Sequence, residues 1–249
     1  MPLLKTRAVI LRSLRWGDAD RILTFYSKNF GKIRGVARGA RRMKTRFGGV
    51  LEPFGIVDLT LFQKTPDALG QISQIDLVTS FNPIRKDLGV MIAAARMVRM
   101  VEVITVDRDQ NQEMFSALAH GLEMLTPESD LALLTLLFQI HVLGHTGFRP
   151  QLDHCAECGK TEASHTPQWF SPRLGGMVCN PCGQRGGGPV LSLSKGSVAF
   201  IEHARRLPMA QLSRLKAIGI VRMEVEEAIE GYFHAVVGKS LPRFEQWVS

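Results

Sequence analysis

The chain has 249 residues, of which 45% are hydrophobic and 22% charged. This composition is ordinary for a globular protein and excludes a disordered or fibrous chain, while the length allows two modest domains. No apolar run approaches the ~18 residues of a membrane span, and the first residues lack the pattern of a secretory signal. We therefore expect a cytoplasmic protein.

The positive charge of the chain is concentrated near its start. Residues 1–50 contain 13 Lys and Arg but only two acidic residues, Asp18 and Asp20, whereas the remainder is slightly acidic. Clustered positive charge attracts phosphate backbones over long distances, so the asymmetry favours a domain that binds nucleic acid. A solvated basic surface and an anionic membrane surface are the alternatives. Membrane binding usually uses a basic amphipathic helix, and the pattern here is not helical.

The first eighty residues have the pattern of five short strands. Apolar and polar residues alternate in segments that are separated by Gly-, Pro- and Asp-containing turns. The predicted strands span residues 5–16, 21–27, 32–38, 56–62 and 71–78. In the first strand, one face is expected to contain Ala8, Ile10, Leu14 and Trp16. Five short strands suit a small antiparallel barrel, and the OB-fold is the barrel of this kind that binds oligonucleotides.

The pattern becomes helical at Asn82-Pro83, a pair suited to open a helix. Helical spacing then predicts a core-facing stripe made of Leu88, Met91, Ala95 and Val98. Further helices are expected at residues 110–125, 131–145 and 218–233. We therefore predict an α+β multidomain protein, with a five-stranded OB-fold domain at 1–80 and a mainly α-helical domain at 81–249.

The four cysteines form two C-x2-C pairs, Cys155/Cys158 and Cys179/Cys182, with 20 residues between the pairs. Two such pairs complete the tetrahedral sulfur shell that zinc prefers and leave no open coordination position. We therefore predict a structural Zn²⁺ ion in a four-cysteine module at about 152–186, inserted in the helical domain. A redox dithiol is the alternative, although a single pair would favour it more. His154 and His165 are spare ligands nearby.

The predicted nucleic-acid-binding residues follow the third strand and the loop after it. They are Lys32, Arg34, Arg38, Arg41, Arg42, Lys44 and Arg46. Strand alternation puts the first three on one face, beside the remaining cations of the loop. The expected barrel core includes six aromatic residues, Trp16, Phe25, Tyr26, Phe30, Phe54 and Phe62. Phe47 is the better candidate for stacking on a base.

The sequence lacks the motifs of common enzymes. Walker A, nucleophile-elbow and dinucleotide-binding patterns are missing. His141 and His145 are four residues apart on a predicted helix, but no glutamate follows the first, as a zincin would require. We predict no catalytic residue and a protein that is not an enzyme. The alternatives are a zinc-dependent nuclease or deaminase that uses the barrel to bind substrate, and a transcription-type zinc-ribbon adaptor.

The sequence resembles the bacterial RecO family of recombinational repair proteins over nearly its whole length. In the first half the matching stretches are 8–11 (AVIL), 17–20 (GDAD), 30–32 (FGK), 35–42 (GVARGARR) and 51–54 (LEPF). In the second half they are 147–150 (GFRP), 170–172 (FSP), 175–176 (GG) and the segment 232–244. Residues 239–243 (KSLPR) replace a second basic or serine element usual in such tails, so we assign the tail no function.

The resemblance implies an N-terminal OB-fold, a helical domain with a zinc module, and a recombination mediator that consumes no cofactor. It implies binding to single- and double-stranded DNA, annealing of complementary strands, and a site of action in the cytoplasm at the nucleoid. With the partner RecR, such proteins help to load RecA onto DNA covered by single-strand-binding protein. A positive surface with little sequence preference reduces the repulsion between two strands and leaves base pairing to select the match.

Overall fold

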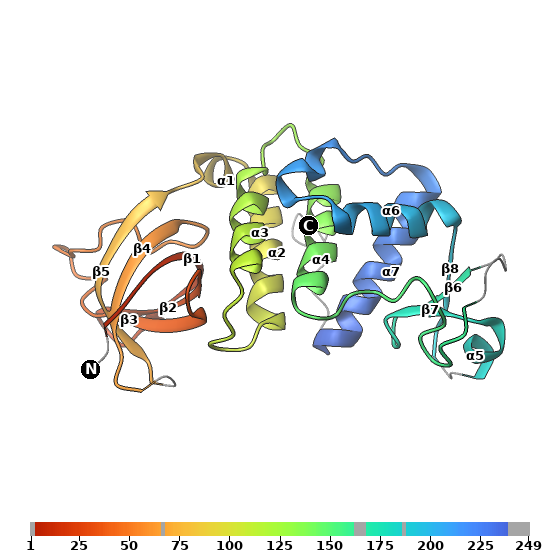
Figure 1. Cartoon of the computed structure of the whole chain (residues 1–249). Helices are drawn as coiled ribbons and strands as arrows, with labels where there is room; N and C mark the ends of the chain where they lie inside the picture. Colours follow the sequence, from red (N-terminus) through yellow and green to blue (C-terminus); the bar gives the residue numbers. More distant parts are fainter. Residues whose placement is uncertain (1–2, 66–67, 162–167, 186–187, 239–249) are drawn as a thin grey trace. The chain divides into compact units, whose positions relative to one another are not determined.

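The computed structural model describes residues 3–65, 68–161, 168–185 and 188–238 (Figure 1). The chain forms two compact units, Met1–Pro127 and Glu128–Ser249. The predicted division into 1–80 and 81–249 stays a prediction. In the described part of the chain, no helix is long and apolar enough to cross a membrane.

The first unit begins with a closed barrel whose strands follow the order β1-β2-β3-β5-β4 (Figure 1). The strands are β1 Leu3–Trp16, β2 Asp20–Ser27, β3 Gly31–Ala37, β4 Ile56–Phe62 and β5 Gly70–Thr79. Neighbouring strands are antiparallel except β3 and β5, which pair in parallel over only two residues each. The five-stranded OB-fold barrel predicted from the strand pattern is confirmed.

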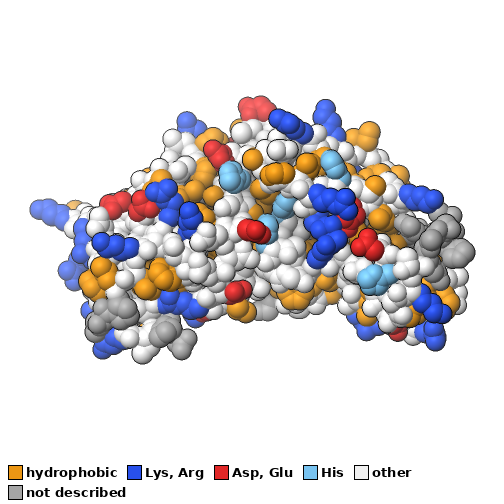
Figure 2. All heavy atoms as spheres, in the orientation of Figure 1, with side chains coloured by type: hydrophobic (Ala, Val, Ile, Leu, Met, Phe, Trp, Pro, Cys, Tyr) orange, Lys and Arg blue, Asp and Glu red, His pale blue; other side chains and the backbone are white. Residues whose placement is uncertain are grey.

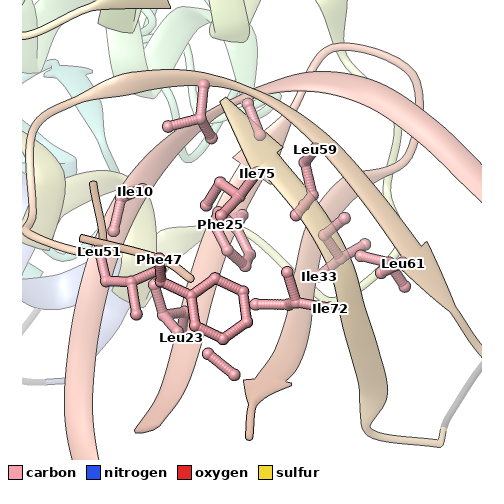
Figure 3. Packing of buried hydrophobic residues seen from close by; sticks show 13 residues of the cluster. Ile10, Leu23, Phe25, Ile33, Phe47, Leu51, Leu59, Leu61, Ile72 and Ile75 are labelled. Atoms are coloured by element: carbon pink, nitrogen blue, oxygen red, sulfur yellow. The ribbon is translucent and has the colours of Figure 1, made fainter. Parts of the chain in front are cut away.

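The barrel interior is filled by alternate residues of β1 to β4, as the pleat of a half-buried strand requires, and by Ile72 and Ile75 of β5, which flank a register shift against β4 (Figure 3). Two further side chains, Phe47 and Leu51, come from the loop after β3 and point into the same interior. Phe47 is only 3% exposed. The prediction that Phe47 stacks on a base is therefore wrong, because the loop folds back and buries this ring in the core.

A β-bulge in β1 changes which residues face the barrel interior. Ile10 pairs with Phe25 and Arg12 with Thr24, so Leu11 is an extra residue in the ladder. Since side chains alternate with a period of two, one extra residue moves all later even-numbered side chains to the other face. Trp16 is consequently exposed, and the expectation that it belongs to the core is wrong. The same expectation is wrong for Phe62, which is exposed because Leu61 occupies the inward position at the end of β4.

Helices α1 (Asn82–Lys86), α2 (Leu88–Ile104) and α3 (Gln112–Glu123) complete the first unit. Asp87 and Asn111 cap α2 and α3, since each side-chain oxygen accepts a hydrogen bond from a backbone N–H three residues later. Both helices pack against β1, whose Val9 and Leu11 are buried outside the barrel core. The outer face of β1 is thus covered by the helix pair.

The predicted core stripe of α2 is only partly correct. Val98 is buried, but Leu88 and Met91 are exposed, and the buried face includes Val90 and Met97. The helix has apolar residues at several angular positions, so the sequence spacing alone could not identify which of its faces is buried.

The segment between α2 and α3 lies along the first half of β3, where β3 has no pairing with β5. Asp107 forms a parallel bridge with Lys32, and the N–H of Arg108 donates to the Lys32 carbonyl at 3.0 Å. The backbone of Asp109 reaches Gly31, whose φ is +59°. A Cβ at Gly31 would lie 2.0 Å from the Asp109 carbonyl oxygen, so only glycine fits this close approach.

The second unit is built around helix α4, Leu131–His145, which is apolar on all sides and almost wholly buried. Around it pack α6 (Lys195–Arg206), the 3₁₀ helix η1 (Met209–Arg214) and α7 (Gly219–Val237). A small sheet in the order β7-β6-β8 consists of β6 Gln168–Ser171, β7 Gly176–Val178 and β8 Leu191–Leu193, with the short helix α5 Asn180–Arg185 beside β6. The mainly helical second half and its inserted cysteine module are confirmed.

We expect Gly31→Ala to destabilise the first unit much more than Gly48→Ala does. Both glycines have positive φ, which costs an alanine roughly 1–2 kcal/mol, but a Cβ at Gly48 meets no atom within 4 Å. The Gly31 variant should lose about 3 kcal/mol or more, since the Asp109 backbone must also move. Urea unfolding of the two variants checks this; equal losses would contradict the close approach.

Candidate nucleic-acid interface and metal centre

The outer face of β3 is basic, as strand alternation predicts. Ile33, Gly35 and Ala37 are buried, whereas Lys32 and Arg34 point outward. Lys and Arg side chains are spread over the barrel in the space-filling view (Figure 2). The structure thus brings the predicted cations of β3 to one surface of the first unit.

Lys32 has a structural role on this surface. Its Nζ donates to the Glu102 carbonyl at 2.8 Å and to the Thr105 carbonyl, and it lies 3.6 Å from the Asp107 carboxylate. These carbonyls lie at the C-terminal end of α2, where a cation is favoured by the helix dipole. The side chain is only 14% exposed. Lys32 therefore joins the barrel to the end of α2.

The other predicted cations differ in how firmly the protein holds them. Arg34 forms a 2.6 Å ion pair with Asp107 yet stays 58% exposed. Arg41 donates to the carbonyls of Gly17 and Asp18, so it supports the β1–β2 turn. Side chains that already have protein partners are less available to phosphate.

Arg46 also has protein partners. Its guanidinium donates to the Ile72 carbonyl at 3.1 Å and lies over the Phe47 ring, 4.8 Å from the centroid. Arg38, Arg42 and Lys44 are exposed, and no carboxylate pairs with them in the part of the chain that the structure describes. These three cations are the ones best placed to contact an external anion.

Trp16, which was expected in the core, is a residue of this surface. It ends β1 with 58% of its surface exposed, and it lines a hollow together with Arg38 and Arg42. An aromatic ring beside two cations is the usual composition of a surface that binds single strands. The signal that could have identified it is its position directly before the Gly17-Asp18 turn.

The four cysteines converge at one point of the second unit. All four sulfur atoms lie within 4.8 Å of one another, and Cys158 Sγ is 3.8 Å from Cys179 Sγ. Four thiolates around zinc, each about 2.3 Å from the ion, are separated by about 3.8 Å. The predicted cysteines are therefore positioned where they could hold a metal ion.

The backbone shapes each cysteine pair as a tight turn. Gly159 donates its N–H to the Cys155 carbonyl at 2.9 Å and has a φ of +72°. In the second pair, Cys182 and Gly183 both donate to the Cys179 carbonyl. These turns aim two sulfur atoms of each pair in the same direction.

A small sheet and apolar side chains hold the two turns together. The N–H of Ala156 donates to the Met177 carbonyl at 2.7 Å, which joins the first turn to β7. Around the sulfur atoms pack Trp169, Leu174, Val178 and Val190. Three cysteines are buried and Cys158 is exposed, so the centre lies just below the surface.

The thiols influence one another strongly. Burial raises the pKa of Cys155, but backbone hydrogen bonds, led by that from Cys158, bring it down to about 6. The pKa of Cys182 is raised to about 12 by its hydrogen bond with Cys179 and by burial. One thiolate thus opposes ionisation of its neighbours, and a cation is needed to hold all four as thiolates.

His141 and His145 are not part of such a centre. His141 Nε2 lies 3.0 Å from the Ala204 carbonyl oxygen, and burial lowers the pKa of the ring. The two rings are 5.8 Å apart, and among the described residues neither belongs to a cluster that could hold a metal. His141 is therefore a packed residue of the second unit.

Family models cover both halves of the chain. The model described as "Recombination protein O N terminal" matches residues 1–81, and the model described as "Recombination protein O C terminal" matches residues 85–243. The first match ends within three residues of the end of β5, so it spans the barrel.

Three relatives named DNA repair protein RecO illustrate the similarity. The protein of Syntrophus aciditrophicus is 30% identical over 241 residues, which cover 95% of this chain and 92% of the relative. The protein of Desulfitobacterium hafniense strain Y51 is 30% identical over 237 residues, with 94% and 85% covered. The protein of Cutibacterium acnes is 36% identical over 193 residues, with 73% and 75% covered.

We expect Lys32→Met to destabilise the first unit by about 1–3 kcal/mol. Methionine preserves an apolar stem but leaves the Glu102 and Thr105 carbonyls without their donor. Arg42→Met is the control, because Arg42 is exposed, and its free energy of unfolding should change by less than about 0.5 kcal/mol. Urea unfolding measures both free energies. A Lys32 variant as stable as the parent would contradict the structural role and group Lys32 with the cations that are available to phosphate.

Proposed function

Because the chain belongs to the RecO family of DNA repair proteins, we propose that it is a recombination mediator that binds single- and double-stranded DNA and anneals complementary strands. It is a DNA repair protein rather than an enzyme. With RecR as partner it promotes loading of RecA onto DNA covered by single-strand-binding protein, in the cytoplasm at the nucleoid.

The observation that supports DNA binding most directly is the set of free cations after β3. Arg38, Arg42 and Lys44 are exposed, come from one short segment, and belong to the part of the chain with 13 basic and two acidic residues. Lysine and arginine that neutralise phosphates release condensed counterions, which gives affinity without base selectivity. We assign the outer contacts of the site to these three residues and supporting contacts to Arg34, Arg41 and Arg46.

Annealing follows from the same electrostatics. Two strands repel each other through their phosphates, and a cationic surface that binds both lowers this repulsion. Weak sequence preference leaves Watson–Crick pairing to decide which strands join. The protein therefore needs no bound nucleotide and no bond-making step.

We propose Zn²⁺ as the ion of the four-cysteine centre. The donor set of four thiolates suits zinc and fills its coordination shell, which leaves no position for a reactive water. This argues for a structural ion and against the zinc-dependent nuclease or deaminase, which needs an open position. The role of the ion is to hold the two cysteine turns and the small sheet in place.

Replacing Arg38, Arg42 and Lys44 together by glutamine should weaken single-strand binding and reduce annealing. Each lost phosphate contact lowers the salt slope on single strands by about 0.7, so the slope should fall by about two if all three contact phosphate. Fluorescence anisotropy at several salt concentrations measures the slope, and circular dichroism first verifies the fold.

The matched control removes three exposed cations of the second unit, Lys195, Arg214 and Lys216, in the same way. Both triple variants change the net charge equally. If the two variants bind and anneal DNA alike, general charge rather than this surface determines affinity and the site assignment is wrong.

The purified protein should contain one zinc per chain, and the paired change Cys155→Ser and Cys158→Ser should remove it. Thermal stability of the second unit should fall, because the binding free energy of structural zinc, on the order of 10 kcal/mol in zinc-finger peptides, contributes to folding. His154→Ala is the control, since His154 hydrogen-bonds to Gln151 and is not in the cluster. Full zinc content in the double variant, by elemental analysis, would refute the assignment.

A further inference from the structure

The hollow beside Trp16 is formed by the parts of an OB-fold that commonly bind oligonucleotides, the β2–β3 face and the loops after β1 and before β5. Its lining comes from Trp16, Asp20, Val36, Gly39 and Leu69, together with Arg38 and Arg42. The volume is about 460 Å³, which lies within the range of small-ligand sites. The hollow therefore has room for a flat ring of nucleobase size.

Hydrogen bonds fix the walls of the hollow. The Asp20 carboxylate accepts the Gly39 N–H at 2.8 Å, and the Arg41 N–H donates to the Ala19 carbonyl at 2.9 Å. Gly39 has a φ of +70°, and Arg42 folds over it, since a Cβ there would lie 3.5 Å from Arg42 Cδ. The β1–β2 turn and the loop after β3 thus hold Trp16 and Arg42 on the same hollow.

The charges of the hollow select what can enter it. Arg38 and Arg42 attract phosphate, but the Asp20 carboxylate among the lining residues repels a phosphate placed inside. A neutral base can occupy the interior, with its ring on the exposed indole, while its two flanking phosphates meet the arginines. Base–aromatic stacking of this kind tolerates every base, because each has a π-face.

We propose that Trp16 is a stacking platform for one unpaired base of single-stranded DNA, held between Arg38 and Arg42. The inference rests on the proposed DNA-binding function and adds a preference for unpaired strands. In a duplex the bases are already stacked on each other, so the platform contributes only to single-strand binding. The site thus distinguishes the strand before annealing from the product after it.

The test compares three probes of equal length: an oligothymidylate, an abasic strand with the same phosphates, and a duplex. Trp16→Ala should weaken binding of the oligothymidylate about 5- to 150-fold, the range that corresponds to one stacked base. Its binding to the abasic strand and to the duplex should change less than twofold, and its salt slope should match the parent. Trp16→Phe should retain most of the affinity.

The control is Phe62→Ala, which removes an exposed aromatic ring of β4 that does not line the hollow. It should bind all three probes like the parent. Equal losses on the oligothymidylate and abasic strands, or no loss on either, overturn the stacking platform while DNA binding stands. A parent protein that binds none of the probes overturns the proposed function and the platform together.

Discussion

The ammonium group of Lys32 links the barrel to the helices that follow it, because it extends from β3 and donates hydrogen bonds to carbonyls at the end of α2. It neutralises the carbonyl end of α2 from the outer face of β3, and the segment that follows α2 lies along the same strand. β3 pairs with β5 over only two residues, so this segment supplies the backbone partner that the first half of β3 would otherwise lack. The basic outer surface is therefore carried by a strand that is held on both sides.

The cations of this surface divide into two groups once their partners are known. Lys32, Arg41 and Arg46 donate to backbone carbonyls of a helix end, a turn and strand β5, respectively. Arg38 and Arg42 remain available beside Trp16. Sequence charge alone cannot separate these groups, because the backbone carbonyls that bind them come from distant segments. The distinction matters for mutagenesis, since changes in the first group alter stability as well as affinity.

The sequence was sufficient to predict the five strands and the cysteine cluster, because strand alternation and C-x2-C spacing are local patterns. It was insufficient for Trp16, which was expected in the core but is exposed, and for Phe47, which was expected at the surface but is buried. Trp16 lies outside the core because of a one-residue bulge at Leu11. Phe47 lies inside the core because the loop that carries it, which has no regular structure, closes the barrel. Both outcomes depend on tertiary packing, which produces no periodic pattern of apolar residues from which it could be predicted.

Because of the bulge at Leu11, the face on which Trp16 lies depends on whether the number of residues between them is odd or even. Each residue added to or removed from β1 after the bulge moves every following side chain to the opposite face of the strand. Trp16 therefore stays on its present face only when the length changes by two residues. Insertion or deletion of two residues would lengthen or shorten the end of β1 that precedes Trp16 and leave the orientation of the indole intact. A single deletion between Arg12 and Arg15 would instead turn the indole to the opposite face of the hairpin and bring a neighbouring side chain to the hollow.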